Sequence, residues 1–473
     1  MQIRRLLKFS AEPANPRIAA VEPAASGVAG DGMSLATRGL RTFRPRLPNE
    51  SLMSSRFSDF KKVGHWPTLL AAFLYFDFSF MVWVALGPLI LYIAKSLDLS
   101  VDDRFAIVAI PILAGALLRI PLGALADHIG AKATGAGAQL VVIIAIAYAW
   151  LAGLHSKLEL ELLALALGVA GASFAVALPQ AGRWYPPRYQ GLVMGIAGAG
   201  NMGVVLETLT APWLAEHFGW QNALGCVLLF LVPTLIFYLL AAKDAPEIRQ
   251  RASWRSYRAL LADPDSWRFM FFYFITFGGF VGLANALPLY FTLQFHVSGV
   301  AAGLIVAVIV LFGSAFRPLG GHIADRLGGI RTLLALFAVV SLAYLAVAFL
   351  PSGPAAAAPS GWGIATMPAI AWFAMLLFSA GVLALGMGNG AVFQLVPQRF
   401  RREIGIMTGL VGCAGGIGGF LLARVLGLSK VYSGDFTGGF ILFSVLALFC
   451  LAGLTLVRKR WRASWGAVSG ARV

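Results

Sequence analysis

Two mid-span arginines stand at corresponding places in long apolar runs of this sequence, Arg119 within residues 104–126 and Arg317 within residues 299–323. If these runs cross a membrane, an ionised side chain there costs at least about 2.5–3.5 kcal/mol and normally faces a cavity and a partner. A guanidinium is planar, permanently charged and carries paired donors, which suit a flat trigonal anion better than a lysine ammonium does. Two converging guanidiniums would repel each other unless a small oxyanion lay between them. The pair therefore predicts an anion site, and the alternative is a structural ion pair between each arginine and a carboxylate.

Two carboxylates also stand inside apolar runs, Asp77 and Glu207. Bringing an anion into a cell against a negative-inside potential costs about 2.3 kcal/mol per charge per 100 mV. Protons that travel with the anion would offset that cost, and a carboxylate in a dry place can carry them because burial favours its protonated form. We hypothesise that Asp77, with Glu207 second, couples protons to anion entry. The alternative is a fixed partner for an arginine, and exchange of two anions of equal charge would need no titrating group at all.

The composition assigns the elements that must hold these residues to a membrane. Hydrophobic residues make up 59% of the 473 residues and charged residues 12%, whereas a soluble domain has about 45–50% and about 25%. Each apolar run is about 20 residues or longer, the length that spans a bilayer as a helix. The chain is therefore predicted to be an all-α integral membrane protein. Its net charge of +16 lies at the edges of these runs, so it reports orientation rather than nucleic-acid binding.

Twelve apolar runs are predicted to be transmembrane helices. Their approximate bounds are 66–94, 104–126, 133–154, 159–182, 189–214, 219–241, 267–294, 299–323, 331–350, 367–394, 404–427 and 436–457. Basic residues gather in alternate links, and by the positive-inside bias both termini and the basic central link 242–266 are cytoplasmic. An even number of crossings agrees with that orientation.

The two halves of the chain, 65–241 and 267–457, repeat one another. Residues 119–130 and 317–328 share Arg, Gly, Ala, Asp and Gly at identical spacing, and each copy ends the second span of its half. Phe174 followed by Pro179-Gln180 is echoed by Phe393 followed by Pro397-Gln398. Six spans in the same order in each half predict two pseudo-symmetric halves related by an axis along the membrane normal.

Glycine-rich stretches recur at matching places, 195–203 and 409–419. Such a density of glycine would melt a helix in water, but in a bilayer the helix survives and the missing side chains let two helices approach closely. Close packing is the simpler interpretation; the paired occurrence indicates helices that slide while a site between them changes access. The glycines concerned are Gly198, Gly200, Gly203, Gly409, Gly412, Gly415, Gly416, Gly418 and Gly419.

The remaining segments carry weaker signals. Residues 1–64 form a basic lead without periodic pattern, for which we expect disorder and a start of translation at Met53 or Met33; residues 458–473 are expected to be a cytoplasmic tail. Three cysteines (Cys226, Cys413, Cys450) lie in apolar runs without metal spacing and are expected to be buried thiols. We expect no metal, no cofactor and no catalytic residue, because the chain lacks a nucleotide loop, a metal cluster and a nucleophile–base pair.

Several of these motifs also resemble a known family. The Gly-x-x-x-Asp-x-x-Gly loop after spans 2 and 8 resembles the signature of the major facilitator superfamily. Residues 197–203, 388–394 and 409–419, the paired arginines and the aromatic stretch 273–280 look like the nitrate/nitrite porter family within it. The resemblance covers roughly residues 65–457 and implies the major facilitator fold.

The resemblance also implies roles for further residues. Phe174, Tyr273 and Phe277 would form aromatic walls around a flat anion, and Asn201 and Asn389 would donate amides to the anion or hold the arginines. From the residues alone, packing aromatics and asparagines bonded to neighbouring helices are equally natural interpretations. Two loop carboxylates, Asp127 beside Lys132 and Asp325 beside Arg326 and Arg331, would belong to charge clusters that latch one end shut, although their ordinary role is a solvated surface.

Together these features favour a secondary active transporter of nitrate, with nitrite as a second substrate, that works by alternating access as proton-coupled uptake. The alternatives are nitrate/nitrite antiport without protons, a facilitator for another small or organic anion, and a receptor built on a transporter fold. An enzyme is not expected. The expected partners are nitrate, nitrite, protons and the lipid bilayer, without nucleic acid, for a monomer in the inner (plasma) membrane.

Overall fold

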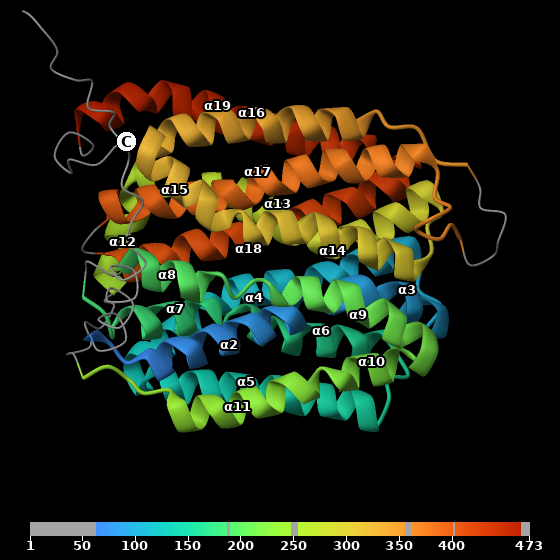
Figure 1. The fold of residues 1–473 in the computed structure, drawn as a ribbon, viewed down its shortest axis with the longest axis horizontal. Helices are drawn as coiled ribbons and strands as arrows, with labels where there is room; N and C mark the ends of the chain where they lie inside the picture. The colour runs from blue at the N-terminus through green and yellow to red at the C-terminus, as the bar shows by residue number, and fades with distance from the viewer. Residues whose placement is uncertain (1–62, 187–189, 247–253, 355–360, 401–402, 465–473) are drawn as a thin grey trace, which may run out of the picture. The chain divides into compact units, whose positions relative to one another are not determined.

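The computed structural model describes residues 63–186, 190–246, 254–354, 361–400 and 403–464, and in this part every regular element is helical (Figure 1). Among these residues, an isolated β-bridge pairs Val297 with Trp362. The predictions for residues 1–62 and 465–473 lie outside the described part. The start of the predicted tail, residues 458–463, is helical and continues the last span.

Ten helical segments lie in the described part of the first half of the chain. They are α2 (Trp66–Trp83), α3 (Leu86–Ser96), α4 (Val101–Ile129), α5 (Ala131–Leu151), α6 (Lys157–Gly171), α7 (Phe174–Gly182), α8 (Gln190–Gly198), α9 (Gly203–Phe218), α10 (Trp220–Cys226) and α11 (Leu228–Ala241).

The second half forms seven segments, preceded by a short helix in the central link. They are α13 (Pro264–Phe295), α14 (Gly299–Ala315), α15 (Arg317–Leu327), α16 (Gly329–Ala348), α17 (Ala369–Arg399), α18 (Ile404–Ser433) and α19 (Thr437–Ala463). The link helix, α12 (Trp254–Ala262), lies within the predicted linker 242–266.

In the described part, eleven helices are long and apolar enough to cross a membrane. The remaining predicted crossing, 189–214, which is span 5 of the chain, is present as α8 and α9. These two helices follow one another end to end in Figure 1, but each is too short to cross a membrane by itself. This confirms the all-α fold of twelve spans. Gly130, where α4 meets α5, marks what we call the inner end of the helices, and Val101, where α4 begins, marks the outer end.

In the described part five spans are interrupted, and proline accounts for two of the breaks. Pro88 cannot donate a hydrogen bond to the carbonyl of Val84, so α2 and α3 are separated there and the Gly87 amide bonds that carbonyl instead, at 2.9 Å. Pro318 likewise cannot donate to the carbonyl of Ser314, and α14 ends at Ala315 before α15 begins at Arg317. A third break, between α8 and α9, falls in the glycine-rich stretch 195–203. Two further short breaks separate α6 from α7 and α10 from α11.

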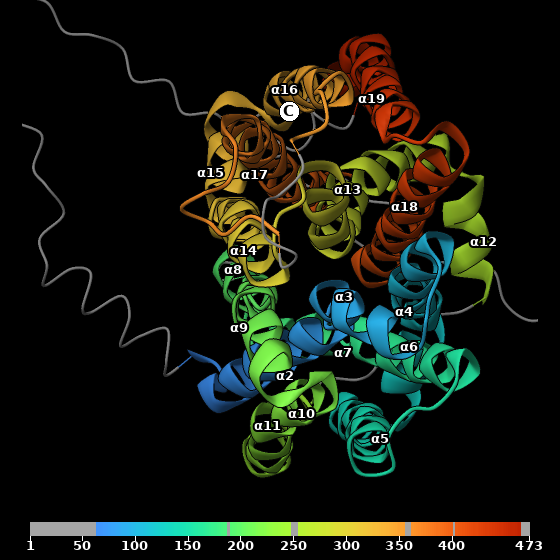
Figure 2. The same ribbon diagram turned by 90° about the vertical axis from the view of Figure 1, so that its right-hand side faces the viewer.

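The two halves meet mainly through two helix pairs, α4 against α18 and α9 against α14, with a smaller contact of α3 against α13. Figure 2 shows these helices roughly end on. In the first pair, a Cβ added to Gly416 would lie 2.5 Å from that of Ala116. In the second, a Cβ added to Gly303 would lie 2.5 Å from the carbonyl oxygen of Thr208. Glycine therefore brings the backbones of opposite halves into direct contact, which follows the small-residue rule for helices in lipid.

Candidate functional site

Arg119 lies on α4 with its side chain almost completely buried, 1% exposed. Its Nε donates to the carbonyl of Gly171 at 3.2 Å, and its Nη1 donates to the carbonyl of Gly412 on the opposite half. Its Nη2 is buried without a partner. No ion pair between Arg119 and a carboxylate occurs among the described residues, so the structural-bridge alternative finds no support there.

Three aromatic rings surround the Arg119 guanidinium. Its Cζ lies 5.3 Å from the ring centroid of Trp83 and 5.1 Å from those of Phe174 and Phe277. These distances are within the range of cation–π attraction, which strengthens where water is excluded. Trp83 was missed by the sequence analysis. It is the last residue of α2, the helix that contains Asp77, and its Nε1 donates to the Pro111 carbonyl at 2.6 Å.

Arg317 begins α15, immediately after the break in span 8, and is half-buried. Its Nη2 lies 3.5 Å from the hydroxyl of Tyr273, a weak hydrogen bond. Its Nη1 is buried without a partner. Its Cζ lies 6.0 Å from the ring centroid of Phe393, a residue that the sequence analysis recognised as the mirror of Phe174 without assigning it a role.

Two pairs of rings connect the arginines. Tyr273 and Phe277 are stacked, with centroids 5.0 Å apart and planes at 6°, and the centroids of Phe174 and Phe393 are 6.1 Å apart. Tyr273 also meets Phe393 edge to face at 5.0 Å. Each arginine thus contacts one ring of each pair. The tertiary structure brings together both predicted arginines and all three predicted aromatic residues.

Two buried asparagine side chains have both amide atoms unpartnered. Asn201 is 1% exposed and Asn389 is 0% exposed. The backbone carbonyl of Asn201 accepts from the Ser314 hydroxyl at 3.4 Å, three residues before Arg317. A Cβ added to Gly390, beside Asn389, would strike the backbone of Arg317. Buried amides without partners are uncommon in folded proteins, and a polar ligand is one explanation of them.

Comparison with known proteins identifies the family. The family model described as Major Facilitator Superfamily matches residues 68–423. The chain is 31% identical over 373 residues to "Nitrite extrusion protein" of Bacillus subtilis, an alignment that covers 78% of this chain and 89% of that protein. It is 33% identical over 375 residues to "Probable nitrate/nitrite transporter NarK2" of Mycobacterium tuberculosis, with 78% and 91% covered. "Probable nitrate/nitrite antiporter NarK1" of Thermus thermophilus is 29% identical over 381 residues, with 76% and 84% covered.

This chain belongs to the nitrate/nitrite porter family of the major facilitator superfamily. The family that the sequence motifs indicated is therefore confirmed. Membership also makes the porter a multi-pass membrane transporter and not an enzyme, as expected.

The second glycine stretch of this porter packs α18 between the two halves. A Cβ added to Gly412 would lie 3.1 Å from Arg119 Nη1, and one added to Gly415 would lie 2.7 Å from the Tyr273 ring. Gly418 faces the backbone of α13, and Gly419 faces Ile112 of α4. By contrast, a Cβ added to Gly409 or Gly198 would meet no atom within 4 Å, so close packing accounts for neither of these glycines.

The first glycine stretch packs on α2 instead. A Cβ added to Gly200 would lie 2.7 Å from the ring of Phe76, and one added to Gly203 would strike the carbonyl oxygen of Asp77. The carboxylate of Asp77 accepts a hydrogen bond from the Gly203 amide at 2.8 Å. One turn along α9, Glu207 is 2% exposed and its Oε1 is buried without a partner. Neither carboxylate forms an ion pair with an arginine in the described part of the chain.

The predicted gate carboxylates differ in their surroundings. Asp127, at the inner end, forms an ion pair of 2.6 Å with Arg183. Lys132, the neighbour expected to pair with Asp127, instead donates its backbone amide to Asp244 at 3.0 Å. Asp325 is exposed at the end of α15, and within the described ranges no ion pair reaches it.

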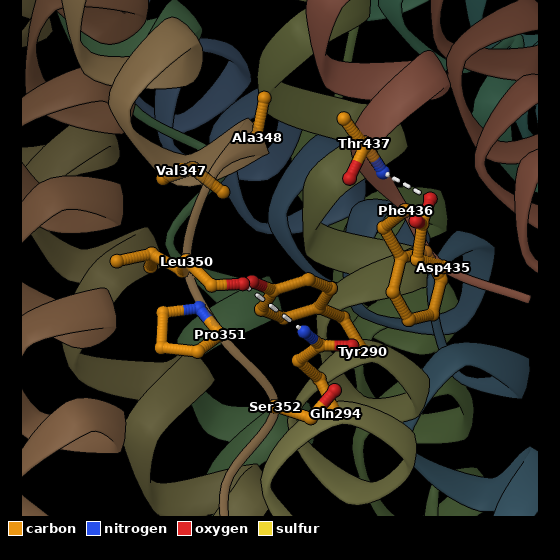
Figure 3. Close-up of a pocket in the computed structure, with 10 residues that line it drawn as sticks. All are labelled: Tyr290, Gln294, Val347, Ala348, Leu350, Pro351, Ser352, Asp435, Phe436 and Thr437. Carbon is orange, nitrogen blue, oxygen red and sulfur yellow. Dashed lines mark hydrogen bonds between the residues drawn. The ribbon is translucent and has the colours of Figure 1, made fainter.

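Two features lie at the outer end, away from Arg119 and Arg317. Arg424 of α18 pairs with Asp102 of α4 at 3.0 Å and links the two halves. A cavity of about 220 Å³ opens where α13, α16 and the α18–α19 link meet (Figure 3). Its wall includes Gln294, whose Nε2 bonds the Leu350 carbonyl at 3.4 Å. The residues lining it include neither arginine nor any ring of the aromatic cluster, so this cavity is separate from the candidate anion site.

Proposed function

We propose that this porter transports nitrate, with nitrite as a second substrate, by alternating access between its two halves. One observation carries the proposal: Arg119 Nη2 and Arg317 Nη1 are both buried without a partner, on arginines from opposite halves that share one aromatic cluster. Uncompensated guanidiniums are costly in a membrane. An anion that accepts from both would remove that cost and would tie the two halves together. The names of the relatives, nitrite extrusion protein and nitrate/nitrite transporter, support these ions as the substrates.

The aromatic walls favour a flat ion. Tyr273 and Phe277 present parallel faces, and Phe174 and Phe393 approach from a second direction. A trigonal anion can lie between guanidinium planes and ring faces, whereas a tetrahedral anion of similar charge needs more depth. The amides of Asn201 and Asn389 would supply further donors to the oxygens of the ion.

For the coupling, we propose proton symport with Glu207 ahead of Asp77 as the proton carrier. Glu207 is almost fully buried and has an unpartnered oxygen, whereas the Asp77 carboxylate already accepts a backbone amide. The competing function is nitrate/nitrite antiport, which the name of the Thermus thermophilus relative favours and which requires no proton carrier.

Reconstitution in liposomes separates these functions. Nitrate uptake would be measured with and without an inward proton gradient, and with and without nitrite inside. Uptake driven by the proton gradient alone supports symport, and uptake that requires internal nitrite supports antiport. Absence of nitrate uptake under all four conditions contradicts the proposed function.

A pair of glutamine substitutions on α9 tests the proton carrier. Glu207→Gln should abolish proton-driven uptake and leave nitrate/nitrite counterflow intact. Glu216→Gln, on the same helix but exposed, is the matched control and should retain both activities. Full proton-driven uptake in Glu207→Gln would exclude Glu207 from this role.

We also propose that the porter is a monomer in the inner (plasma) membrane with the inner end in the cytoplasm. The basic residues Lys132, Arg183, Arg326 and Arg399 all lie at the inner end, as the positive-inside bias requires of the cytoplasmic side. Asp127 and Asp325 would then act at the cytoplasmic mouth. A cysteine introduced beside Arg462 should react with an impermeant maleimide in inverted vesicles and not in whole cells.

A further inference from the structure

The break in span 5 is held against α2 by its own glycines. Residues 199–202, between α8 and α9, form turns rather than helix. Gly200 and Gly203 leave no room for a side chain between this break and the α2 segment that contains Phe76 and Asp77. The backbone of the break therefore lies within hydrogen-bonding reach of any polar side chain on that segment.

Asp77 supplies that side chain. Its Oδ1 accepts from the Gly203 amide at 2.8 Å. This is the first amide of α9, which has no acceptor within its own helix. Met202, the residue at the N-cap position, makes no side-chain cap. A carboxylate at a helix N-terminus satisfies free amides and complements the helix dipole, so Asp77 caps α9 from a neighbouring helix.

The capped break adjoins the anion site. Asn201 lies two residues before the capped Gly203 amide, and its own side chain is buried with both amide atoms unpartnered. Its carbonyl accepts from Ser314, at the break in span 8 that precedes Arg317. The two interrupted spans therefore touch at their breaks, and each break carries a polar residue with unsatisfied donors.

The second half provides an internal comparison. Its glycine stretch lies on α18, which runs unbroken from Ile404 to Ser433. The first span of that half, α13, has one acidic residue, Asp265, in its first turn and none facing the glycine stretch further along. In the first half, the first span carries the mid-span carboxylate of Asp77 and the glycine-rich span is broken. In the second half, the first span has no mid-span carboxylate and the glycine-rich span, α18, is continuous.

We propose that Asp77 is a positioning residue: its carboxylate holds the break in span 5 open and thereby directs the Asn201 amide toward the bound anion. The inference rests on the proposed transport of nitrate. It assigns Asp77 a role as hydrogen-bond acceptor that an amide oxygen can replace, which distinguishes it from a proton carrier.

The test compares Asp77→Asn with Asp77→Leu in the reconstituted full-length porter, measuring nitrate Km and maximal rate of uptake and of nitrite counterflow. Leucine removes the acceptor, and we expect nitrate Km to rise about tenfold, the effect of losing one charge-assisted capping hydrogen bond. Asparagine keeps one acceptor oxygen, and we expect it to recover most of that loss, with a Km within about threefold of the wild type. Proton-driven uptake should persist in Asp77→Asn.

A second background separates positioning from general damage. In an Asn201→Ala porter the target of positioning is gone, so Asp77→Leu should raise Km by less than about twofold there, because the two changes act through one contact. Ser100→Ala removes a different cap, at the outer start of α4, and should leave nitrate Km unchanged although it also weakens a helix.

Three results would overturn the inference. One is loss of proton-driven uptake with intact counterflow in Asp77→Asn, which would make Asp77 the proton carrier. Another is an unchanged Km in a folded Asp77→Leu porter, and the last is additive effects with Asn201→Ala. Failure of the proposed function itself is a different result, the absence of nitrate transport by the wild-type porter under all conditions.

Discussion

Replacement of Arg119 by lysine tests the anion site most directly, because it keeps the charge and removes the guanidinium fork. In the structure Nε and Nη1 bond two carbonyls, of Gly171 and Gly412, and Nη2 remains for a ligand. A lysine has a single nitrogen with three donors and no planar fork. It can satisfy the carbonyls or the anion, but not all of them in good geometry.

The expected size of the effect follows from one lost charge-assisted hydrogen bond. Such a bond contributes about 1.5–3 kcal/mol, and 1.4 kcal/mol is about a factor of ten in affinity. Arg119→Lys should therefore raise nitrate Km in proteoliposomes by roughly 10- to 150-fold. Initial rates of uptake over a range of nitrate concentrations would measure this, after the variant is shown to elute as the wild type does on size exclusion.

Arg424→Lys is the matched control. Arg424 is also a transmembrane arginine, but it pairs with Asp102 at the outer end, and both side chains are partly exposed, 23% and 43%. A lysine preserves that ion pair, and exposed pairs contribute about 0–1 kcal/mol, so Km should change by less than about fivefold. If a folded Arg119→Lys porter showed a Km no higher than that of Arg424→Lys, the assignment of the site would be refuted.

Three further predictions concern the surroundings of the site. Gly416→Ala should reduce uptake and lower the melting temperature, because the added methyl group would lie 2.5 Å from the Cβ of Ala116 on the facing helix. Gly409→Ala is the control and should retain uptake, because a Cβ there would meet no atom within 4 Å. Tyr273→Phe removes the hydroxyl that contacts Arg317 and should raise nitrate Km about two- to tenfold, the contribution of one hydrogen bond; an unchanged Km would show that this bond is not used. Asp102→Asn breaks the Arg424–Asp102 ion pair between the halves and should speed the modification of buried Cys413 by an impermeant maleimide added at the outer side. Mass spectrometry would measure the rate of modification, and a rate equal to that of the wild type would show that this ion pair does not hold the outer end closed.

Local properties of the sequence determined the architecture of this porter. The hydrophobic length of each run predicts a span irrespective of its neighbours. For this reason the twelve predicted runs coincide with the observed helices to within about six residues at each end, apart from the five interruptions. The repeat of Arg119 and Arg317 at identical spacing in the two halves likewise predicted that both would contribute to one site. The break in span 5 could not be predicted in this way, because its cap, Asp77, lies 126 residues earlier in the chain.

Only the tertiary structure decided which groups contact the arginines of the site. Arg119 bonds the carbonyl of Gly412 across a separation of 293 residues, and no local pattern specifies which carbonyl will lie there. Trp83 and Phe393 joined the aromatic cluster for the same reason: in a chain rich in phenylalanine, only the packing of the helices selects the rings that face a charge. The depth of each arginine in the bilayer follows from its position within an apolar run, so the sequence alone predicts it. Its partners depend on which helix faces lie side by side, so only the tertiary structure decides them.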